Sequence, residues 1–408
     1  MLCGLDQLSG NQFASLRRRL RDARVGVLTH QAAVDRQGRQ TLEVLEELGI
    51  VPRLVFAPEH GFDAVAQAEE AVSSVAGDAT RGFSVDVISL YGKTKEDLTP
   101  SSEKLAEIDV LLIDLADVGS RYYTYVWTAL LAARAAEAAK VHTVVLDRPN
   151  PISGDPNLVE GSPQLAEFLS FVGLEALPIR HSLTVGEILA HFFELAGSAL
   201  GPEGALSVVP VRGWERLRSA EAWRRPFVPP SPNMPTLETA LVYPGACLIE
   251  GTNLSEGRGT TTPFQLVGAP FLDGRELARR LRETGLLGAW VRPVSFRPSF
   301  EKHAGAVCNG VMLHVTNPSM FRPVATYLSL VAIARQLAPE AFAFRDTPYE
   351  FESDRPAFDL LTGSDKARAA ILQGAPAEDV VALVAPVESR WKSLVLEAEV
   401  RLGKCVAA

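Results

Sequence analysis

Short apolar runs alternate with helix-like patterns through the first half of the chain. Runs rich in valine, isoleucine and leucine predict five strands, at 23–31, 51–58, 83–92, 108–119 and 141–151. Between them, 41–49 and 120–140 have the composition of helices, the second with Ser120 as its N-cap. Strands that alternate with helices are typical of a parallel sheet with helices on both faces. We therefore expect an α/β domain at the N-terminus.

The second half has a different pattern. The stretch 224–245 is rich in proline, which removes backbone donors and predicts irregular structure. Beyond it, 307–317 resembles a strand and 321–338 a helix, so we expect a smaller α+β domain. The two expected domains are residues 1–245 and 246–408.

Length, charge and cysteine content exclude several classes of protein. The 408 residues fit two domains, and a net charge of −9 argues against a protein that holds nucleic acid by its phosphates. Four scattered cysteines without a C-x-x-C pair predict neither a zinc site nor a disulfide framework. Dinucleotide and phosphate-binding loops and tight histidine clusters are absent, so we expect no cofactor and no metal.

The sequence also bears on location. The N-terminus lacks a basic segment followed by an apolar one, and no apolar run is long enough to span a membrane. We expect the chain as given to be cytoplasmic. A removed export signal would instead place it in the periplasm or outside the cell.

Polar side chains at strand ends are the first candidates for a site, because parallel α/β sheets bind ligands beyond the carboxyl ends of their strands. Glu59 and His60 stand at such an end, between Pro58 and Gly61. Proline fixes φ and glycine permits a tight turn, so the pair is expected to be held firmly, as a general acid requires. The competing interpretation is a loop acid that caps the next helix.

Two further segments carry candidate binding groups. In SRYYTY (120–125), Tyr122 and Tyr125 are suited to stack on a sugar and Arg121 to hold a carboxylate; core packing is the alternative. The glycine-rich loop 247–270 is too polar for a core element, and we expect it to line an interdomain cleft. Its candidates are Glu250, Asn253, Glu256 and Arg258, although a surface loop with Arg258 in a salt bridge would look the same.

For other polar residues, the sequence fits a structural role as well as a functional one. Asn150 and Glu160 follow the fifth predicted strand. Thr184 and Glu187 form the pattern of a capping box at the start of a helix, so Glu187 is expected to be a cap.

Together these stretches resemble the exo-β-N-acetylmuramidases of the NamZ type. The resemblance rests on APEHGF, SLYGKTKEDLTP, DLADVGSRYYTYVWT, VLDRPNPISG, VEGSPQ, PIRHSLTVGE, FRPSFEKHAG and above all the block 229–270. It implies a Rossmann-like N-terminal domain, a smaller C-terminal domain and an active site in the cleft between them. It also implies release of N-acetylmuramic acid from the non-reducing end of peptidoglycan fragments, in cell wall recycling if the enzyme acts inside the cell.

The resemblance makes Glu59 the leading catalytic residue, either protonating the leaving oxygen itself or acting beside a second group. His60 or a neighbouring tyrosine is expected to tune it, and Asn233 in PPSPNMP to contact the substrate. An arginine suits the lactyl carboxylate of the sugar, with Arg121 and Arg258 as candidates.

The second carboxyl stays open among Glu160, Glu250 and Glu256, and attack by the 2-acetamido group of the sugar is also open. The partners expected are peptidoglycan-derived muramyl saccharides. A non-catalytic protein that binds wall sugars in the same cleft is the alternative function.

Overall fold

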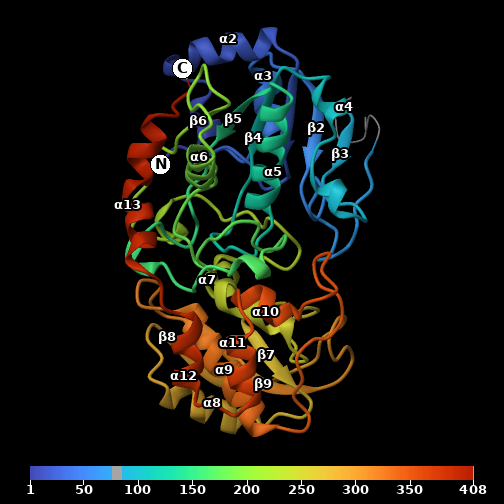
Figure 1. Cartoon of the computed structure of the whole chain (residues 1–408), viewed down its shortest axis with the longest axis vertical. Helices are drawn as coiled ribbons and strands as arrows, with labels where there is room; N and C mark the ends of the chain where they lie inside the picture. The colour runs from blue at the N-terminus through green and yellow to red at the C-terminus, as the bar shows by residue number, and fades with distance from the viewer. Residues whose placement is uncertain (76–84, 408) are drawn as a thin grey trace.

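A computed structural model describes residues 1–75 and 85–407. In this part of the chain, a six-stranded parallel sheet has the order β3-β2-β1-β4-β5-β6 (Figure 1). Its strands are β1 (Val25–Thr29), β2 (Pro52–Ala57), β3 (Val87–Ser89), β4 (Val110–Asp114), β5 (His142–Leu146) and β6 (Leu206–Val209). The five predicted strands are confirmed, except that residues 83–84 lie outside the described ranges. The order is that of a Rossmann fold, in which the direction of winding reverses between β1 and β4.

Helices cover both faces of this sheet (Figure 1). One face packs against α1 (Gly4–Gln7), α2 (Ala14–Asp22) and α3 (Thr41–Glu47), and the other against α4 (Ser102–Leu105), α5 (Tyr125–Ala138) and α6 (Val185–Leu195). Successive side chains of a strand point to opposite faces. Val27 and Val55 therefore belong to the first layer, and Leu28 and Phe56 to the second.

The helix expected from residue 120 begins later than predicted, and Ser120 is not its N-cap. It begins at Tyr125, with Thr124 as the preceding residue. The backbone N–H of Arg121 donates instead to the carbonyl of Ile179 at 2.8 Å. Pairing with this neighbouring segment takes residues 120–121 out of the helical path. At the next helix, the predicted capping box at the start of α6 is confirmed.

The proline-rich stretch is irregular only in part. From Leu237 the chain forms α7 (Leu237–Ala246), with Pro244 inside the helix, so the prediction of irregular structure up to residue 245 is wrong for these last residues. The hydroxyl of Thr236 caps the helix by accepting a hydrogen bond from the Thr239 N–H at 3.2 Å. Helix α7 is buried against α9, and this packing outweighs the unfavourable proline.

The second domain is α+β, as predicted. An antiparallel sheet of order β7-β9-β8 packs against α8 and α7, and α9 packs against α7, α8 and α12. The elements are β7 (Leu266–Ala269), α8 (Gly274–Glu283), β8 (Ala289–Phe296), β9 (Cys308–Val315), α9 (Pro323–Leu337), α10 (Ala357–Thr362), α11 (Lys366–Leu372) and α12 (Ala377–Val384). Short 3₁₀ segments lie at 11–13, 95–98, 156–158, 166–168, 220–222 and 247–251.

The last helix, α13 (Ser389–Gly403), leaves the second domain and packs against α6 of the first (Figure 1). After it, the carbonyl of Cys405 accepts a hydrogen bond from the Val208 N–H at 2.7 Å. The end of the chain therefore joins the β6 edge of the large sheet. In the described ranges, no helix is long and apolar enough to cross a lipid bilayer.

Candidate active site

A small cavity lies where the carboxyl end of β2 faces the second domain. Its polar lining includes Glu59, His60, Tyr122, Thr124, Asn233, Glu250, Arg258, Tyr349 and Glu350. The space left between these side chains is about 30 Å³. Ligand pockets usually measure about 300–1,000 Å³, so the cavity is closed too tightly to hold a sugar ring.

Glu59 enters this cavity from a rigid corner. The chain turns immediately after β2, where the Gly61 N–H donates to the Pro58 carbonyl at 3.0 Å. His60 and Gly61 both have positive φ, 68° and 78°, which is costly for a histidine. The Glu59 side chain is 5 % exposed, and its Oε2 accepts a hydrogen bond from the Thr124 hydroxyl at 2.6 Å. The carboxylate is therefore held at the start of α5.

His60 also lines the cavity, and one of its ring nitrogens makes a hydrogen bond to the backbone. Its Nδ1 lies 2.9 Å from the Ala66 carbonyl, which can only accept, so Nδ1 carries a hydrogen. The ring lies edge-on to Tyr125, with the ring centres 6.4 Å apart. The hydroxyl of Tyr125 donates to the carbonyl of Pro230 at 2.9 Å. Tyr125 thus supports this corner from behind instead of lining the cavity.

Glu350 is a second cavity carboxyl, which the sequence analysis missed. It sits at the tip of a tight turn closed by two backbone hydrogen bonds between Tyr349 and Glu352, each 2.9 Å long. Burial raises the pKa of Glu350 well above its usual range, and the negative charges of Glu59 and Glu69 raise it further. The hydroxyl of Tyr91 donates to Oε2 of Glu350 at 2.9 Å and acts on this pKa in the opposite direction.

Arg258 and Glu250 form a buried ion pair in the cavity. Nη2 of Arg258 lies 2.7 Å from Oε1 of Glu250, whose Oε2 accepts from the Tyr349 hydroxyl at 2.7 Å. Nε of Arg258 lies 3.2 Å from Glu256, which also pairs with Lys302 at 2.9 Å. Glu256 does not line the cavity. Its carboxylate fixes Arg258 and the loop that carries it.

Four other predicted residues serve backbone groups instead of the cavity. Nη1 and Nη2 of Arg121 donate to the carbonyls of residues 162, 177 and 361, the last of them in α10. Glu160 accepts hydrogen bonds from the first N–H groups of α9, and its burial raises its pKa to about 7. Asn150 and Asn253 each bridge loop backbone groups with both ends of their amides. The sequence analysis had these four residues as catalytic or substrate-binding candidates, and the structure instead shows them bonded to backbone groups.

Two predicted binding residues do reach the cavity. Asn233 lines it while donating to the side chain of Gln67 at 2.7 Å. Tyr122 lines it too, with the Arg121 guanidinium 5.2 Å from its ring centre. The Tyr122 hydroxyl makes no hydrogen bond within the described ranges. It is thus a buried donor left for a ligand or a water molecule.

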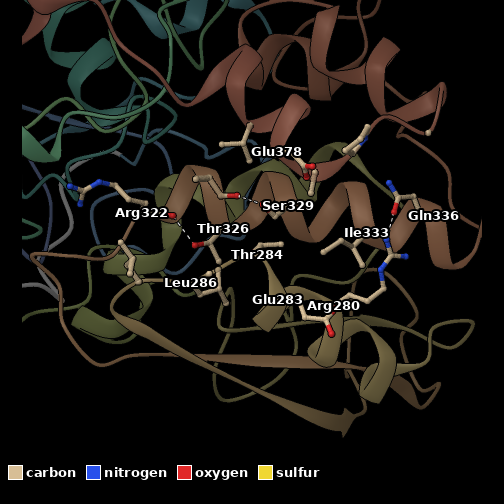
Figure 2. Close-up of a pocket in the computed structure, with 17 residues that line it drawn as sticks. Arg280, Glu283, Thr284, Leu286, Arg322, Thr326, Ser329, Ile333, Gln336 and Glu378 are labelled. Atoms are coloured by element: carbon tan, nitrogen blue, oxygen red, sulfur yellow. Dashed lines mark hydrogen bonds between the residues drawn. The ribbon is translucent and has the colours of Figure 1, made fainter.

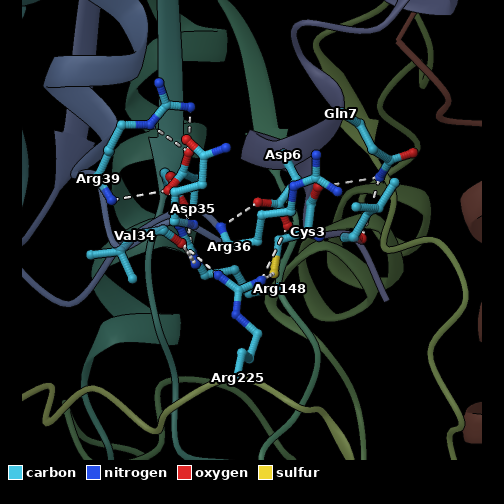
Figure 3. Close-up of polar contacts among 12 residues, drawn as sticks. Cys3, Asp6, Gln7, Val34, Asp35, Arg36, Arg39, Arg148 and Arg225 are labelled. Atoms are coloured by element: carbon cyan, nitrogen blue, oxygen red, sulfur yellow. Dashed lines mark hydrogen bonds and ion pairs between the residues drawn. The ribbon is translucent and has the colours of Figure 1, made fainter.

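A polar network lies beyond the carboxyl ends of β1 and β4, where Rossmann folds bind nucleotides (Figure 3). Arg148 pairs with Asp114 at 2.5 Å, and Arg225 pairs with Asp6 at 3.1 Å. Both guanidinium groups also donate to the carbonyl of Val34, at 2.8 and 2.9 Å. These contacts tie the N-terminal segment to the sheet and leave a cavity of only about 60 Å³ beside them.

A larger cavity, of about 930 Å³, lies in the second domain between α8, α9 and α12 (Figure 2). Its charged side chains are Arg280, Glu283, Arg322 and Glu378, two of each sign. It lacks the converging buried carboxyls of the smaller cavity. Among the described residues, no group of three metal-binding side chains comes together.

Comparisons with known proteins agree with this architecture. The model of the N-terminal part of exo-β-N-acetylmuramidase NamZ matches residues 25–238, and that of its C-terminal part matches 241–398. The peptidoglycan β-N-acetylmuramidase NamZ of Bacillus subtilis (strain 168) is 40 % identical over 379 residues, which cover 93 % of this chain and 86 % of that protein.

Two crystal structures of DUF1343 family proteins from Bacteroides fragilis NCTC 9343 have the same fold. One is 27 % identical, with a TM-score of 0.81 over 97 % of this chain and 98 % of its own. The other is 24 % identical, with a TM-score of 0.69 over 99 % and 98 %.

Fold and cavity thus define a two-domain α/β protein with paired acids in a closed cavity. The chain belongs to the NamZ family of exo-β-N-acetylmuramidases. The family resemblance expected from the sequence motifs is confirmed.

Proposed function

We propose that this protein is an exo-β-N-acetylmuramidase that releases N-acetylmuramic acid from the non-reducing end of peptidoglycan fragments, with the small cavity as its active site. The observation that carries the proposal is the pair of buried carboxyls, Glu59 and Glu350, which reach one cavity from different domains. Within the described ranges neither forms an ion pair, unlike Glu250. The Bacillus subtilis relative is a peptidoglycan β-N-acetylmuramidase, which supports the same substrate.

The two carboxyls have different environments and are suited to different roles. Glycosidases usually place one protonated and one ionised carboxyl about the scissile bond. Burial and the charge of Glu59 raise the pKa of Glu350, so it keeps a proton to give to the leaving oxygen as the bond to the anomeric carbon breaks. Glu59, hydrogen-bonded by Thr124, is the carboxylate that offsets positive charge on the sugar. The sequence-based hypothesis had Glu59 itself as the proton donor.

Recognition of muramic acid falls to Arg258. Its Nη2 and Nε are used by Glu250 and Glu256, and this pairing fixes the plane of the guanidinium. Nη1 makes no hydrogen bond to the described residues and remains available for the lactyl carboxylate, which N-acetylglucosamine lacks. Both terminal nitrogens of Arg121 donate to backbone carbonyls elsewhere, and Arg121 does not line the cavity, so it is not assigned this role.

Hydrolysis of a chromogenic β-N-acetylmuramic acid glycoside, beside the matching N-acetylglucosamine glycoside, tests the proposal. The wild type should cleave only the muramic substrate. Glu59→Gln and Glu350→Gln should each lower kcat about 10²–10⁴-fold, the usual contribution of a positioned acid or base. Glu160→Gln is the matched control, since Glu160 caps α9 outside the cavity, and it should keep wild-type kcat.

Each other outcome would redirect the assignment. Full activity in Glu350→Gln would show that Glu350 is not the acid. Full activity in Glu59→Gln would show that Glu59 is not the catalytic carboxylate. Saturable binding of muramyl saccharides without turnover by the folded wild type would overturn the enzymatic proposal in favour of a wall-sugar binding protein.

A further inference from the structure

Glu350 reaches the cavity on a segment of the second domain that lies against the first. This segment, residues 345–355, is called the strap here. Its polar contacts with the first domain include Arg345 to Glu69 at 2.9 Å, Tyr91 to Glu350 at 2.9 Å, Lys95 to Glu352 at 2.7 Å and Arg355 to the Leu169 carbonyl at 3.3 Å. Glu350 therefore lies in the cavity only while the strap is seated on the first domain.

The backbone at the tip of the strap is strained. Glu350 and Phe351 are the central residues of the turn, and both have positive φ, 46° and 67°. Such turns normally use asparagine and glycine, because a Cβ atom makes this conformation unfavourable for other residues. Contacts outside the turn must hold it in place, and strain of this kind collects at functional sites.

Tyr91 supplies those contacts to both tip residues. Its ring lies edge-on to Phe351, with the centres 5.4 Å apart, and its hydroxyl donates to Oε2 of Glu350 at 2.9 Å. Tyr91 is itself buried, 2 % exposed, in the loop after β3. Tyr91 of the first domain therefore fixes the position of the Glu350 carboxyl, which belongs to the second domain.

The direction of this hydrogen bond decides where the proton of Glu350 lies. A protonated carboxyl has one hydroxyl and one carbonyl-like oxygen. Since Tyr91 donates to Oε2, that oxygen is the acceptor, and the proton is left on Oε1. We propose that Tyr91 is the positioning residue of the acid, which seats the strap tip and confines the transferable proton to Oε1 of Glu350; this rests on the proposed function.

The expected signature is a shifted pH profile. The groups that face Glu350 are the carboxyls of Glu59, Glu69 and Glu250 and the hydroxyls of Tyr91 and Tyr349. Of these, only Tyr91 donates to Glu350 in the part of the chain that the structure describes. A donor favours the ionised form, so its removal should raise the pKa of the acid and move the alkaline limb of the kcat profile to higher pH.

The experiment is the pH dependence of kcat and KM for Tyr91→Phe on the muramic glycoside. The alkaline limb should move up by about one pH unit, the size of a hydrogen bond to a charged oxygen. At the optimum, kcat should fall about two- to tenfold with KM nearly unchanged, because a contact needed for proton transfer is lost. Tyr327→Phe is the matched control: its buried hydroxyl donates to the Phe264 carbonyl at 2.6 Å and makes no contact with either acid.

The outcomes separate this inference from the proposed function. A wild-type profile in Tyr91→Phe, with Glu59→Gln and Glu350→Gln inactive, would overturn the role of Tyr91 and leave the function intact. Activity in Glu350→Gln would overturn both the acid and its positioning residue.

If Tyr91→Phe does not fold, Phe351→Leu is the second test, because it weakens the ring contact and keeps the hydroxyl. It should lower kcat and leave the alkaline limb in place. Unchanged kcat in that variant would overturn the seating role.

Discussion

Thr124 offers the sharpest prediction at the scale of single residues. Its hydroxyl donates to Oε2 of Glu59 at 2.6 Å, while making no capping bond for α5, although the residue stands at the N-cap position. Thr124→Val keeps the shape of the side chain and removes only the donor. We expect kcat to fall about tenfold, the value of one hydrogen bond to a charged group, with little change in the melting temperature. A wild-type kcat, or a large loss of stability, would show that the hydroxyl serves the fold instead.

At the same scale, the sequence identified Glu59 but not Glu350, for a physical reason. Pro58 and Gly61 predict a rigid turn at a strand end, and this signal is contained in the local sequence. Glu350 lies in a turn of glutamate and phenylalanine, residues that do not favour positive φ, and contacts with residues far along the chain, such as Tyr91 and Phe171, help to hold it. The hydrogen bond between Tyr91 and Glu350 joins residues 259 positions apart, beyond the reach of any local pattern.

At the scale of elements, Glu160 makes a prediction about α9. Its carboxyl accepts the N–H groups of Val324 and Ala325, at 3.3 and 2.8 Å, and burial raises its pKa to about 7. The unfolded chain releases this proton near its ordinary pKa of about 4.3. Between those values the folded state holds the extra proton, so its stability should fall as pH rises.

Denaturant unfolding of the wild type and Glu160→Gln at several pH values measures this effect. The unfolding free energy of the wild type, relative to the variant, should decrease from about pH 4.5 to about pH 7 and then level off, because the amide of the variant does not titrate. A difference that stays constant would mean that the α9 N–H groups and nearby Arg180 keep the carboxyl ionised.

Elements also show where local pattern fails. Strands β1, β2, β4 and β5 were predictable because their apolar runs are buried on both faces, whereas β6 was not predicted. The start of α5 was not predictable, since residues 120–121 pair with the segment around Ile179, far along the chain. Helix α7 was not predictable either, because its proline suggests a break in the helix, and packing against α9 outweighs that preference.

At the scale of the whole molecule, the proposed function needs more room than the cavity of about 30 Å³ offers, so we expect the domains to part to admit a sugar and to close again around it. The ion pair of Lys95 and Glu352, at 2.7 Å, holds the strap in the closed arrangement, and the lysine is more than half exposed. An exposed pair contributes about 1 kcal/mol or less. Lys95→Ala should therefore lower kcat on the muramic glycoside by at most about fivefold, because the closed state that presents Glu350 becomes less populated.

Lys93→Ala is the control that separates loss of the ion pair from loss of a positive charge on this loop. Lys93 is exposed two residues away, and its side chain makes no contact with the strap among the described residues, so Lys93→Ala should keep wild-type kcat. Lys95→Arg should keep it as well. At about 1 M salt, where the Debye length is only about 3 Å, the wild type should approach the kcat of Lys95→Ala. If the two enzymes respond equally to salt, the pair does not hold the strap, and closure depends on the other contacts of the strap, among them those of Tyr91 and the Arg345–Glu69 pair.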